Sequence, residues 1–178
     1  MPYLFLMLGY PGSGKTTFSK LLSQEYGLVH FNTDEIRRHM FTTRDEIIDV
    51  KLNPYVIGAL DYAAEATLRT GVSAIFDANH NTVSERERRG AMAKRYGART
   101  IIVWVKAAAD IAWQRESQRR TDRAYVPIPD VRYNELVAAL EEPTDNEMVI
   151  TLDAESSPEE QLRVFIAEMQ RRGFSVPG

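Results

Sequence analysis

Short apolar runs alternate along the chain with longer segments whose apolar residues recur at helical spacing. This alternation is typical of strands joined by helical crossovers, so it predicts a parallel sheet flanked by helices. The apolar runs predicted to be strands are residues 3–8, 28–31, 72–76, 100–105 and 148–152. The expected fold class is therefore α/β, with helices on both faces of the sheet.

The segments between these runs carry signals that begin and end helices. Ser84 and Glu87 have the spacing of a capping box, and Ser157 followed by Pro158 is typical of a helix start. The glycines that stand where a helix is expected to stop are Gly27, Gly71, Gly97 and Gly173. No internal repeat and no linker rich in Gly, Ser or Pro divides the chain, so residues 1–178 are predicted to form one domain.

Composition narrows the class of protein. With 178 residues, 44% hydrophobic and 26% charged, the chain has the size and core-forming capacity of one globular domain. A formal charge of −3 gives no overall attraction to nucleic acid, which weakens but does not exclude a polynucleotide partner. The absence of cysteine excludes disulfides and thiolate metal sites and favours the cytoplasm. The first apolar run lacks a preceding basic region, so we interpret it as a buried strand rather than a signal peptide.

The clearest motif is a glycine-rich loop that follows the first predicted strand. Residues 9–16 read G-Y-P-G-S-G-K-T, a complete match to the phosphate-loop pattern, directly before a helical segment. Backbone N–H groups of such a loop converge on phosphate oxygens, Lys15 reaches the β- and γ-phosphates, and the Thr16 hydroxyl ligates Mg²⁺. A plain turn is the alternative, which the complete match disfavours. The residues predicted to bind nucleotide are Gly9, Tyr10, Pro11, Gly12, Ser13, Gly14, Lys15, Thr16 and Thr17.

A candidate for the acceptor side follows the second predicted strand. In "TDEIRR", Asp34 and Arg37 are three residues apart, so a helix starting near Thr33 places both on one face. A carboxylate there could accept a proton from an attacking hydroxyl, and a guanidinium could grip an anionic acceptor. An acidic helix start with a solvated arginine is the alternative, which the neighbouring phosphate loop makes the weaker one.

The third predicted strand ends at Asp77, which resembles the second acidic element of phosphate-loop proteins beside the magnesium site. Asn79 and Asn81 could orient the acceptor, or could simply bond their own backbone in a turn. The arginines that begin the next helix are expected mostly to form a solvated face, with some compensating anion nearby; they are Arg86, Arg88 and Arg89.

A second group of arginines lies in a segment that we expect to act as a lid, around residues 113–130. Arg115 and Arg119 are four residues apart, where like charges repel unless an anion joins them. Closing over the γ-phosphate, they would stabilise the charge that develops during transfer, and Arg115 would also contact the nucleotide. Arg120 and Arg123 are weaker candidates for the same role. The excess of seventeen arginines over five lysines suits bidentate phosphate recognition.

Other kinds of site find little support. His30, His39 and His80 lack metal-ligand spacing, and no G-x-S-x-G nucleophile motif is present. Trp104 and Trp113 stand in apolar runs and are interpreted as core residues.

Taken in order, "GYPGSGKTT", "TDEIRR", "FDANHNTVSERER", "WQRESQRR" and "VPIPDVRYNELVAALEEPTDNE" resemble phosphate-loop kinases that include the phage-type 5′-hydroxyl polynucleotide kinase domain and zeta-toxin-like small kinases. The resemblance implies a three-layer fold with a five-stranded parallel sheet in the order 2-3-1-4-5. It assigns the base to Asp34, a substrate-phosphate contact to Arg37, lid functions to Arg115 and Arg119, and the metal site to Thr16 and Asp77. The adenine would lie near residues 153–157.

The resulting hypothesis is an ATP- and Mg²⁺-dependent kinase with a hydroxyl acceptor. A polynucleotide 5′-hydroxyl is the first choice of acceptor. A small metabolite, as in adenylylsulfate kinases and antibiotic phosphotransferases, is the alternative, since these share much of the layout. From another class, a nucleotide-dependent switch with slow hydrolysis remains possible, although it needs no pocket for a second substrate. Residues 41–55 carry no clear pattern and are expected to help shape the acceptor pocket.

Overall fold

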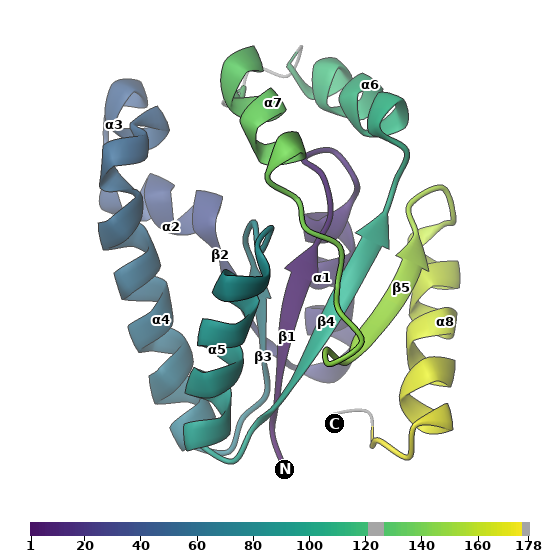
Figure 1. The fold of residues 1–178 in the computed structure, drawn as a ribbon. Coiled ribbons are helices and arrows are strands. Elements are labelled where there is room, and N and C mark those ends of the chain that lie inside the picture. The colour runs from purple at the N-terminus through teal and green to yellow at the C-terminus, as the bar shows by residue number, and fades with distance from the viewer. Residues whose placement is uncertain (121–126, 176–178) are drawn as a thin grey trace.

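A computed structural model describes residues 1–120 and 127–175, and within them five strands form one parallel sheet in the order β2-β3-β1-β4-β5 (Figure 1). Both the parallel sheet and the strand order 2-3-1-4-5 confirm the prediction. The strands are β1 (Tyr3–Leu8), β2 (Val29–Asn32), β3 (Ala74–Asp77), β4 (Arg99–Lys106) and β5 (Val149–Asp153).

Helices cover both faces of the sheet and gather above the carboxyl ends of its strands, where α6 and α7 lie (Figure 1). Figure 1 shows α1 and α8 on one face and α4 and α5 on the other. The helices are α1 (Lys15–Tyr26), α2 (Thr33–Met40), α3 (Arg44–Ile48), the 3₁₀ turn η1 (Val50–Leu52), α4 (Asn53–Arg69), α5 (Val83–Arg95), α6 (Ala109–Arg119), α7 (Asp130–Ala138) and α8 (Pro158–Arg171).

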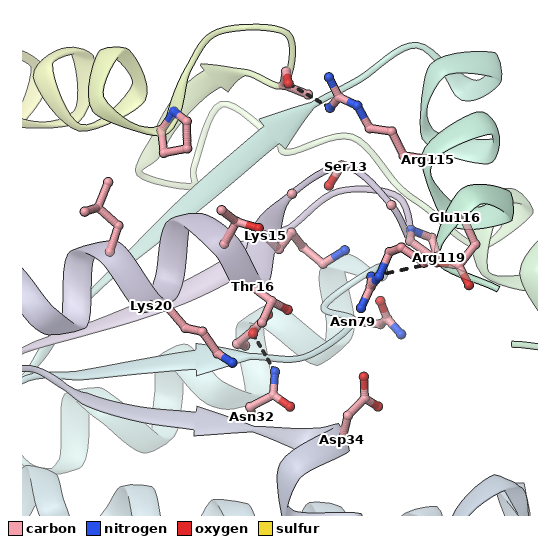
Figure 2. A pocket seen from close by; sticks show the side chains of 18 of the residues that line it. Ser13, Lys15, Thr16, Lys20, Asn32, Asp34, Asn79, Arg115, Glu116 and Arg119 are labelled. Atoms are coloured by element: carbon pink, nitrogen blue, oxygen red, sulfur yellow. Dashed lines mark hydrogen bonds and ion pairs between the residues drawn. The ribbon is translucent and has the colours of Figure 1, made fainter. Parts of the chain in front are cut away.

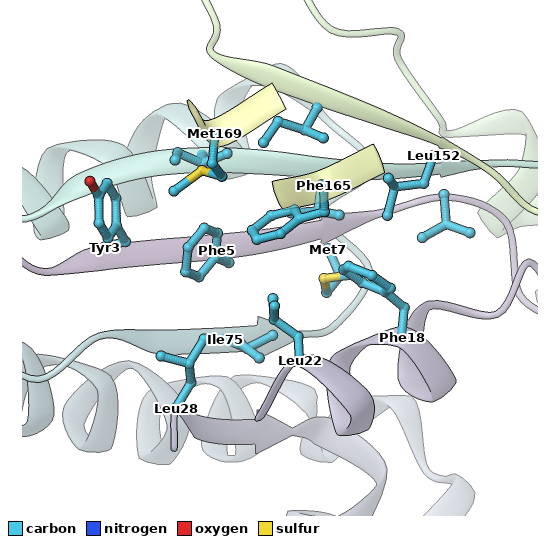
Figure 3. Close-up of a cluster of buried hydrophobic side chains, with 14 of the residues drawn as sticks. Tyr3, Phe5, Met7, Phe18, Leu22, Leu28, Ile75, Leu152, Phe165 and Met169 are labelled. Atoms are coloured by element: carbon cyan, nitrogen blue, oxygen red, sulfur yellow. The ribbon is translucent and has the colours of Figure 1, made fainter. Parts of the chain in front are cut away.

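The central strand β1 divides the core into two halves. Successive side chains of a strand point to opposite faces, and every residue of β1 is buried, as expected of a strand covered on both sides. Phe5 and Met7 pack on one face against Phe18 of α1 and Phe165 of α8 (Figure 3). Leu4, Leu6 and Leu8 pack on the other face against α4 and α5. Because β1 is packed on both faces, its position in the sheet is fixed, and so is the start of the loop that follows it.

The boundaries of β2, β4 and β5 differ from the expected ones by one residue at each end, and two further differences need an explanation. The third strand begins at Ala74 rather than at Val72, whose side chain is exposed. The capping box of α5 uses Thr82 and Glu85 instead of Ser84 and Glu87: the Thr82 side chain accepts from Glu85 N, and Glu85 accepts from Thr82 N. Both pairs have the required spacing, so the local sequence does not discriminate between them.

The stretch 41–55, which carries no clear sequence pattern, forms α3, η1 and the start of α4. Thr43 and Glu46 form a capping box at the start of α3, and the Asp49 side chain accepts from Lys51 N in η1. These short elements pass beside α2 at the edge of the sheet (Figure 1).

Across the described residues we find no helix with both the length and the apolarity needed to cross a membrane.

Candidate active site

Two adjoining cavities open at the carboxyl edge of the sheet. The larger, of about 1100 Å³, lies between the phosphate loop and α6, and we call it the phosphate-loop cleft. The smaller, of about 380 Å³, lies among α2, α3, α4 and α7, and we call it the side pocket. The residues that line both cavities are Thr33, Asp34, Ala78, Asn79 and Ile128. A group at this junction can therefore face occupants of both cavities.

The loop between β1 and α1 is shaped by its glycines. Gly9, Gly12 and Gly14 have φ angles of 142°, 86° and 103°, a region that side chains disfavour. A Cβ at Gly9 would lie 2.4 Å from Val105 O, and one at Gly12 would lie 2.2 Å from Ala112 O. The loop therefore packs directly on β4 and α6, and no other residue fits at these two positions.

The Lys15 side chain is buried at the base of this loop (Figure 2). Its Nζ donates to Gly9 O at 2.7 Å and to Tyr10 O at 2.9 Å. Burial lowers the pKa of Lys15 to about 8, against the opposing effect of the Asp77 and Asp34 carboxylates. An anion bound in the cleft would therefore stabilise the charged form of Lys15.

Asp77, at the end of β3, receives several hydrogen bonds on its buried carboxylate. Asn32 Nδ2 donates to Asp77 Oδ2 at 2.6 Å, His30 Nε2 lies 3.1 Å from the same oxygen, and the Thr16 side chain also bonds to Asp77. Burial alone would raise the pKa of Asp77, but these hydrogen bonds and Lys15 outweigh it, so the pKa lies below its ordinary value. Asp77 is therefore an anion at neutral pH.

Thr16 and Asp77 suit Mg²⁺, which prefers oxygen ligands and usually takes only one or two of them from protein. Their contact places a hydroxyl and a carboxylate together beside the phosphate loop. Among the residues that the structure describes, no group of three or more His, Asp or Glu side chains forms a metal cage of its own. His30 and Asn32, which orient Asp77, were missed from the sequence, although the strand register that pairs Asn32 with Asp77 explains them.

Asp34 lies in the first turn of α2, at the junction of the two cavities (Figure 2). The Asn32 side chain caps this helix by accepting from Glu35 N at 2.9 Å, which fixes where the helix begins. The carboxylate is open to the cavities, yet the surrounding protein desolvates it and raises its pKa, against the opposing charge of Arg38. A carboxylate with a raised pKa is suited to accepting a proton.

Arg37 lines the side pocket together with Asp34, as the spacing predicts, but its guanidinium is engaged by the chain itself. It donates to Ile47 O at 2.9 Å, to Asp49 O at 3.4 Å and to Asn53 Oδ1. Arg37 therefore holds the connection between α3 and α4 against α2. Its contact with an acceptor stays a prediction.

Arg115 and Arg119, one turn apart on α6, both line the phosphate-loop cleft (Figure 2). Arg115 Nη1 donates to Ala154 O at 2.8 Å, which links α6 to the segment after β5. Arg119 Nη1 lies 3.9 Å from Oε2 of the fully buried Glu116. The cleft also reaches Ala154 and Ser156, within the segment expected near the adenine. Arg119 lies close enough to affect the pKa values of Lys15 and Asp34, whereas Arg115 is turned toward Ala154 (Figure 2), so a phosphate contact by either arginine stays a prediction.

The structure places Arg120 away from the cleft, against α7. Arg120 Nη1 lies 2.5 Å from Asp130 Oδ1, Nη2 donates to Ile128 O at 2.8 Å, and the guanidinium lies over the Trp113 ring. Trp113 contacts Tyr133 with ring centroids 4.6 Å apart but is 36% exposed, so its interpretation as a core residue is wrong. Arg123 lies outside the described residues.

The expectation of a solvated arginine face on α5 is wrong for two of the three residues. Arg86 and Arg89 are only 2% and 3% exposed, whereas Arg88 lies in solvent beside Asp61. Arg89 stacks over the Phe76 ring, and Arg86 pairs with Glu147. The expected compensating anions are present. The buried guanidinium groups of Arg86 and Arg89 therefore lie behind the loop that follows β3 and lines the side pocket.

The two asparagines of the loop after β3 lie at the side pocket, and the Asn81 side chain bonds to a distant helix rather than to its own turn. Asn79 lines both cavities, whereas Asn81 Nδ2 donates to Leu136 O of α7 at 2.8 Å. His80 is fully buried, with Nδ1 3.0 Å from Met7 O, and burial lowers its pKa to about 3. His80 is therefore neutral, and its contact with Met7 O connects the loop to β1.

Solved structures with this fold include several kinases. The chain is 19% identical to a sugar kinase from Janibacter sp. HTCC2649, with a TM-score of 0.70 and coverage of 96% of this chain and 95% of that one. It is 17% identical to a gluconokinase from Sinorhizobium meliloti 1021, with a TM-score of 0.66 and coverage of 96% and 93%. It is 18% identical to Chaetomium thermophilum Kti12, solved in complex with ADP-AlF3, with a TM-score of 0.73 and coverage of 94% and 97%.

The sequence itself was also compared with family models and with curated proteins. No curated protein matches the chain. The family model for an AAA domain matches residues 4–143, which include the phosphate loop, Asp34, Asp77 and α6. The chain therefore belongs to the AAA domain family and has the fold of P-loop kinases.

Proposed function

We propose that this protein is an ATP- and Mg²⁺-dependent kinase that transfers the γ-phosphate to a hydroxyl group of a small molecule bound in the side pocket. The observation that carries the proposal is the position of Asp34, whose carboxylate lies where the phosphate-loop cleft and the side pocket meet. A slow nucleotide-dependent switch would need only the first cavity. In this proposal residues 1–178 act as one kinase domain with a lid around 113–130, of which residues 121–126 lie outside the described residues.

Each group of the site has a role that its position supports. Asp34 would accept the proton of the attacking hydroxyl, and Asn79 would orient that hydroxyl. Lys15 and the loop N–H groups would hold the β- and γ-phosphates, while Arg115 and Arg119 would neutralise charge that develops on the transferred group. Thr16 and Asp77 would hold Mg²⁺, which supplies positive charge beside the phosphates.

The shape of the side pocket favours a small acceptor over a polynucleotide end. Its volume of about 380 Å³ is near the lower limit of small-molecule sites. Proteins that bind single-stranded nucleic acid combine a basic groove with stacking aromatic rings. Arg37, Arg38 and Arg132 line the side pocket, but no aromatic residue is among its described lining residues. The solved sugar kinase and gluconokinase with the same fold are consistent with a small hydroxylated acceptor.

The direct test follows labelled γ-phosphate from ATP into candidate acceptors in the presence of Mg²⁺. We expect label to appear in a component of a pooled small-molecule extract and to disappear when Mg²⁺ is chelated. A 5′-hydroxyl oligonucleotide and a reaction without acceptor serve as comparisons. Label on the oligonucleotide alone would contradict the small-molecule acceptor, and release of free phosphate alone would contradict the kinase.

A pH dependence of nucleotide affinity follows from Lys15. Its pKa of about 8 is that of the free protein, and bound phosphate oxygens would favour the ammonium form and raise it. ATP binding should therefore take up protons near pH 8, and its affinity should fall by about tenfold between about pH 7 and about pH 9.5. The terminal phosphate loses its last proton at about pH 6, so its charge changes little from pH 7 upward.

Calorimetry in two buffers of different ionisation enthalpy measures both the affinity and the proton uptake. An affinity that stays constant across this range, without proton uptake near pH 8, would contradict a phosphate contact by Lys15.

A further inference from the structure

The side pocket offers more apolar than polar surface to an occupant. Its apolar lining comes from two sides, with one group on α3, η1 and α4 and the other on or beside α7; these residues are Ile47, Ile48, Val50, Val56, Ile57, Pro127, Ile128, Pro129, Leu136 and Ala139. Ile48 and Val50 are 43% and 52% exposed. Large aliphatic side chains that face a cavity rather than the core mark surface available for apolar contact.

Most polar groups of the same pocket are already engaged by the protein. Arg37 bonds to the connection between α3 and α4, and the Asn53 side chain accepts one of those bonds. Arg132 pairs with Glu135 at 2.9 Å on α7. These groups neutralise one another and hold the walls of the pocket, so they contribute little polar recognition of a ligand.

The same is true of the polar groups at the start of α5. Glu85 and Thr82 bond to each other in the capping box, and Asn81 bonds to Leu136 O. Oδ1 of Asn81 has no hydrogen-bond partner among the described residues, and the other polar groups that remain to face an occupant are concentrated beside the base. They include Asn79 and Asp34, with Arg38 close enough to lower the pKa of Asp34. The pocket is thus polar at its junction with the phosphate-loop cleft and apolar along its walls.

We infer that the acceptor is a compact amphiphilic alcohol. Its hydroxyl lies at Asp34, and its apolar body, an alkyl or aromatic group, lies between the wall of α3, η1 and α4 and the wall of α7. A sugar of the same size would place several hydroxyls against aliphatic side chains, where each hydroxyl that loses its water without finding a partner opposes binding. The inference rests on the proposed function for the identity of the occupant as acceptor, but it concerns binding alone.

Two alcohols with the same skeleton test this inference. Glucose and cyclohexylmethanol both carry a hydroxymethyl group on a six-membered ring and differ chiefly in the ring hydroxyls. We expect calorimetry on the protein with Mg²⁺ and ADP to show cyclohexylmethanol bound at least about tenfold more tightly than glucose, because its ring can be fully desolvated. Benzyl alcohol should behave like cyclohexylmethanol. Equal or tighter binding of glucose, or no binding of either apolar alcohol, would overturn the inference.

A pair of exposed valines provides the matched variants. Val50 lines the pocket, whereas Val131 lies on α7, is 72% exposed and does not line it. Val50→Ser should weaken binding of cyclohexylmethanol about fivefold, and Val131→Ser should leave it unchanged, since both side chains are too exposed to support folding. Equal effects of the two variants on binding of cyclohexylmethanol would overturn the assignment of Val50 to the apolar wall of the pocket. Phosphate transfer from ATP to the same alcohols is measured separately, so tight binding without transfer would contradict the proposed kinase and not the amphiphilic pocket.

Discussion

Replacement of Asp34 by Asn is expected to abolish phosphate transfer while leaving ATP affinity within about threefold of the wild-type value. Asn has nearly the same shape but cannot accept the proton of the attacking hydroxyl, and loss of a general base costs about 10²- to 10⁴-fold in rate. Because Asp34 lies across the cleft from the phosphate loop, we expect nucleotide binding not to require its carboxylate. Transfer of labelled phosphate measures the rate, and calorimetry with ATP measures the affinity.

Glu35→Gln is the matched control, since Glu35 is the next residue of α2, pairs with Lys20 on the surface and lines neither cavity. Glu35→Gln should retain transfer.

The Asp34 carboxylate is also expected to set the acidic limb of the pH profile of phosphate transfer. Burial raises the pKa of Asp34, and transfer needs the ionised form, so the rate should fall as the pH drops through a value above the ordinary pKa of aspartate. Transfer by Asp34→Asn at the wild-type rate would contradict the assignment of the base.

The parts of the site that could be predicted from the sequence depend on local geometry. The phosphate loop is contiguous, its glycines take positive φ angles, and it must stand between a strand and a helix. Asp34 could be placed because α2 begins at the end of a strand, and Asp77 because a buried strand ends there. In a parallel sheet the carboxyl ends of the strands lie at one edge. Short sequence segments were therefore enough to predict that the phosphate loop, Asp34 and Asp77 lie close together.

The parts that could not be predicted depend on contacts between distant segments. Arg37 bonds to carbonyl groups of a stretch without sequence pattern, and no local rule identifies a backbone carbonyl as the partner of a side chain. The side pocket is assembled from α2, α3, η1, α4, α7 and the loop after β3, each contributing a few residues. The choice of Thr82 over Ser84 as helix cap could not be predicted either, since both have the required spacing.

Arg86 is the clearest case of a residue whose role appears only in three dimensions. Its Nε and Nη2 bond to the two carboxylate oxygens of Glu147 at 2.7 and 3.1 Å. Its Nη1 donates to the carbonyl groups of His80, Asn81 and Glu141 at 3.0 to 3.1 Å. One buried cation thus joins the loop that carries Asn79 to the segment that leads into β5.

We expect Arg86→Met to lower the free energy of unfolding by about 3–5 kcal/mol, because it leaves the Glu147 carboxylate and several carbonyl groups without their partner. Arg88→Met, two residues away on the same helix, removes an exposed arginine paired with Asp61 and should cost at most about 1 kcal/mol. Urea denaturation of the three proteins measures the difference. Similar decreases in the free energy of unfolding of the two variants would contradict a stabilising role of Arg86 in this loop.

The pH dependence separates the charge of Glu147 from the carbonyl contacts. Burial raises the pKa of Glu147, but hydrogen bonds from Arg86 and Thr144 outweigh this and hold the pKa below its ordinary value. The pair therefore stabilises the wild-type protein above the unfolded pKa, and this contribution is lost as the pH falls through the folded pKa. In Arg86→Met the Glu147 carboxylate keeps only its bonds from Thr144 and protonates more readily, so the stability gap between the two proteins should narrow in acid. Adding Glu147→Met should recover only the charge-dependent part at neutral pH, and the remaining deficit reflects the carbonyl bonds of Arg86 together with the bonds that Glu147 accepts from Thr144.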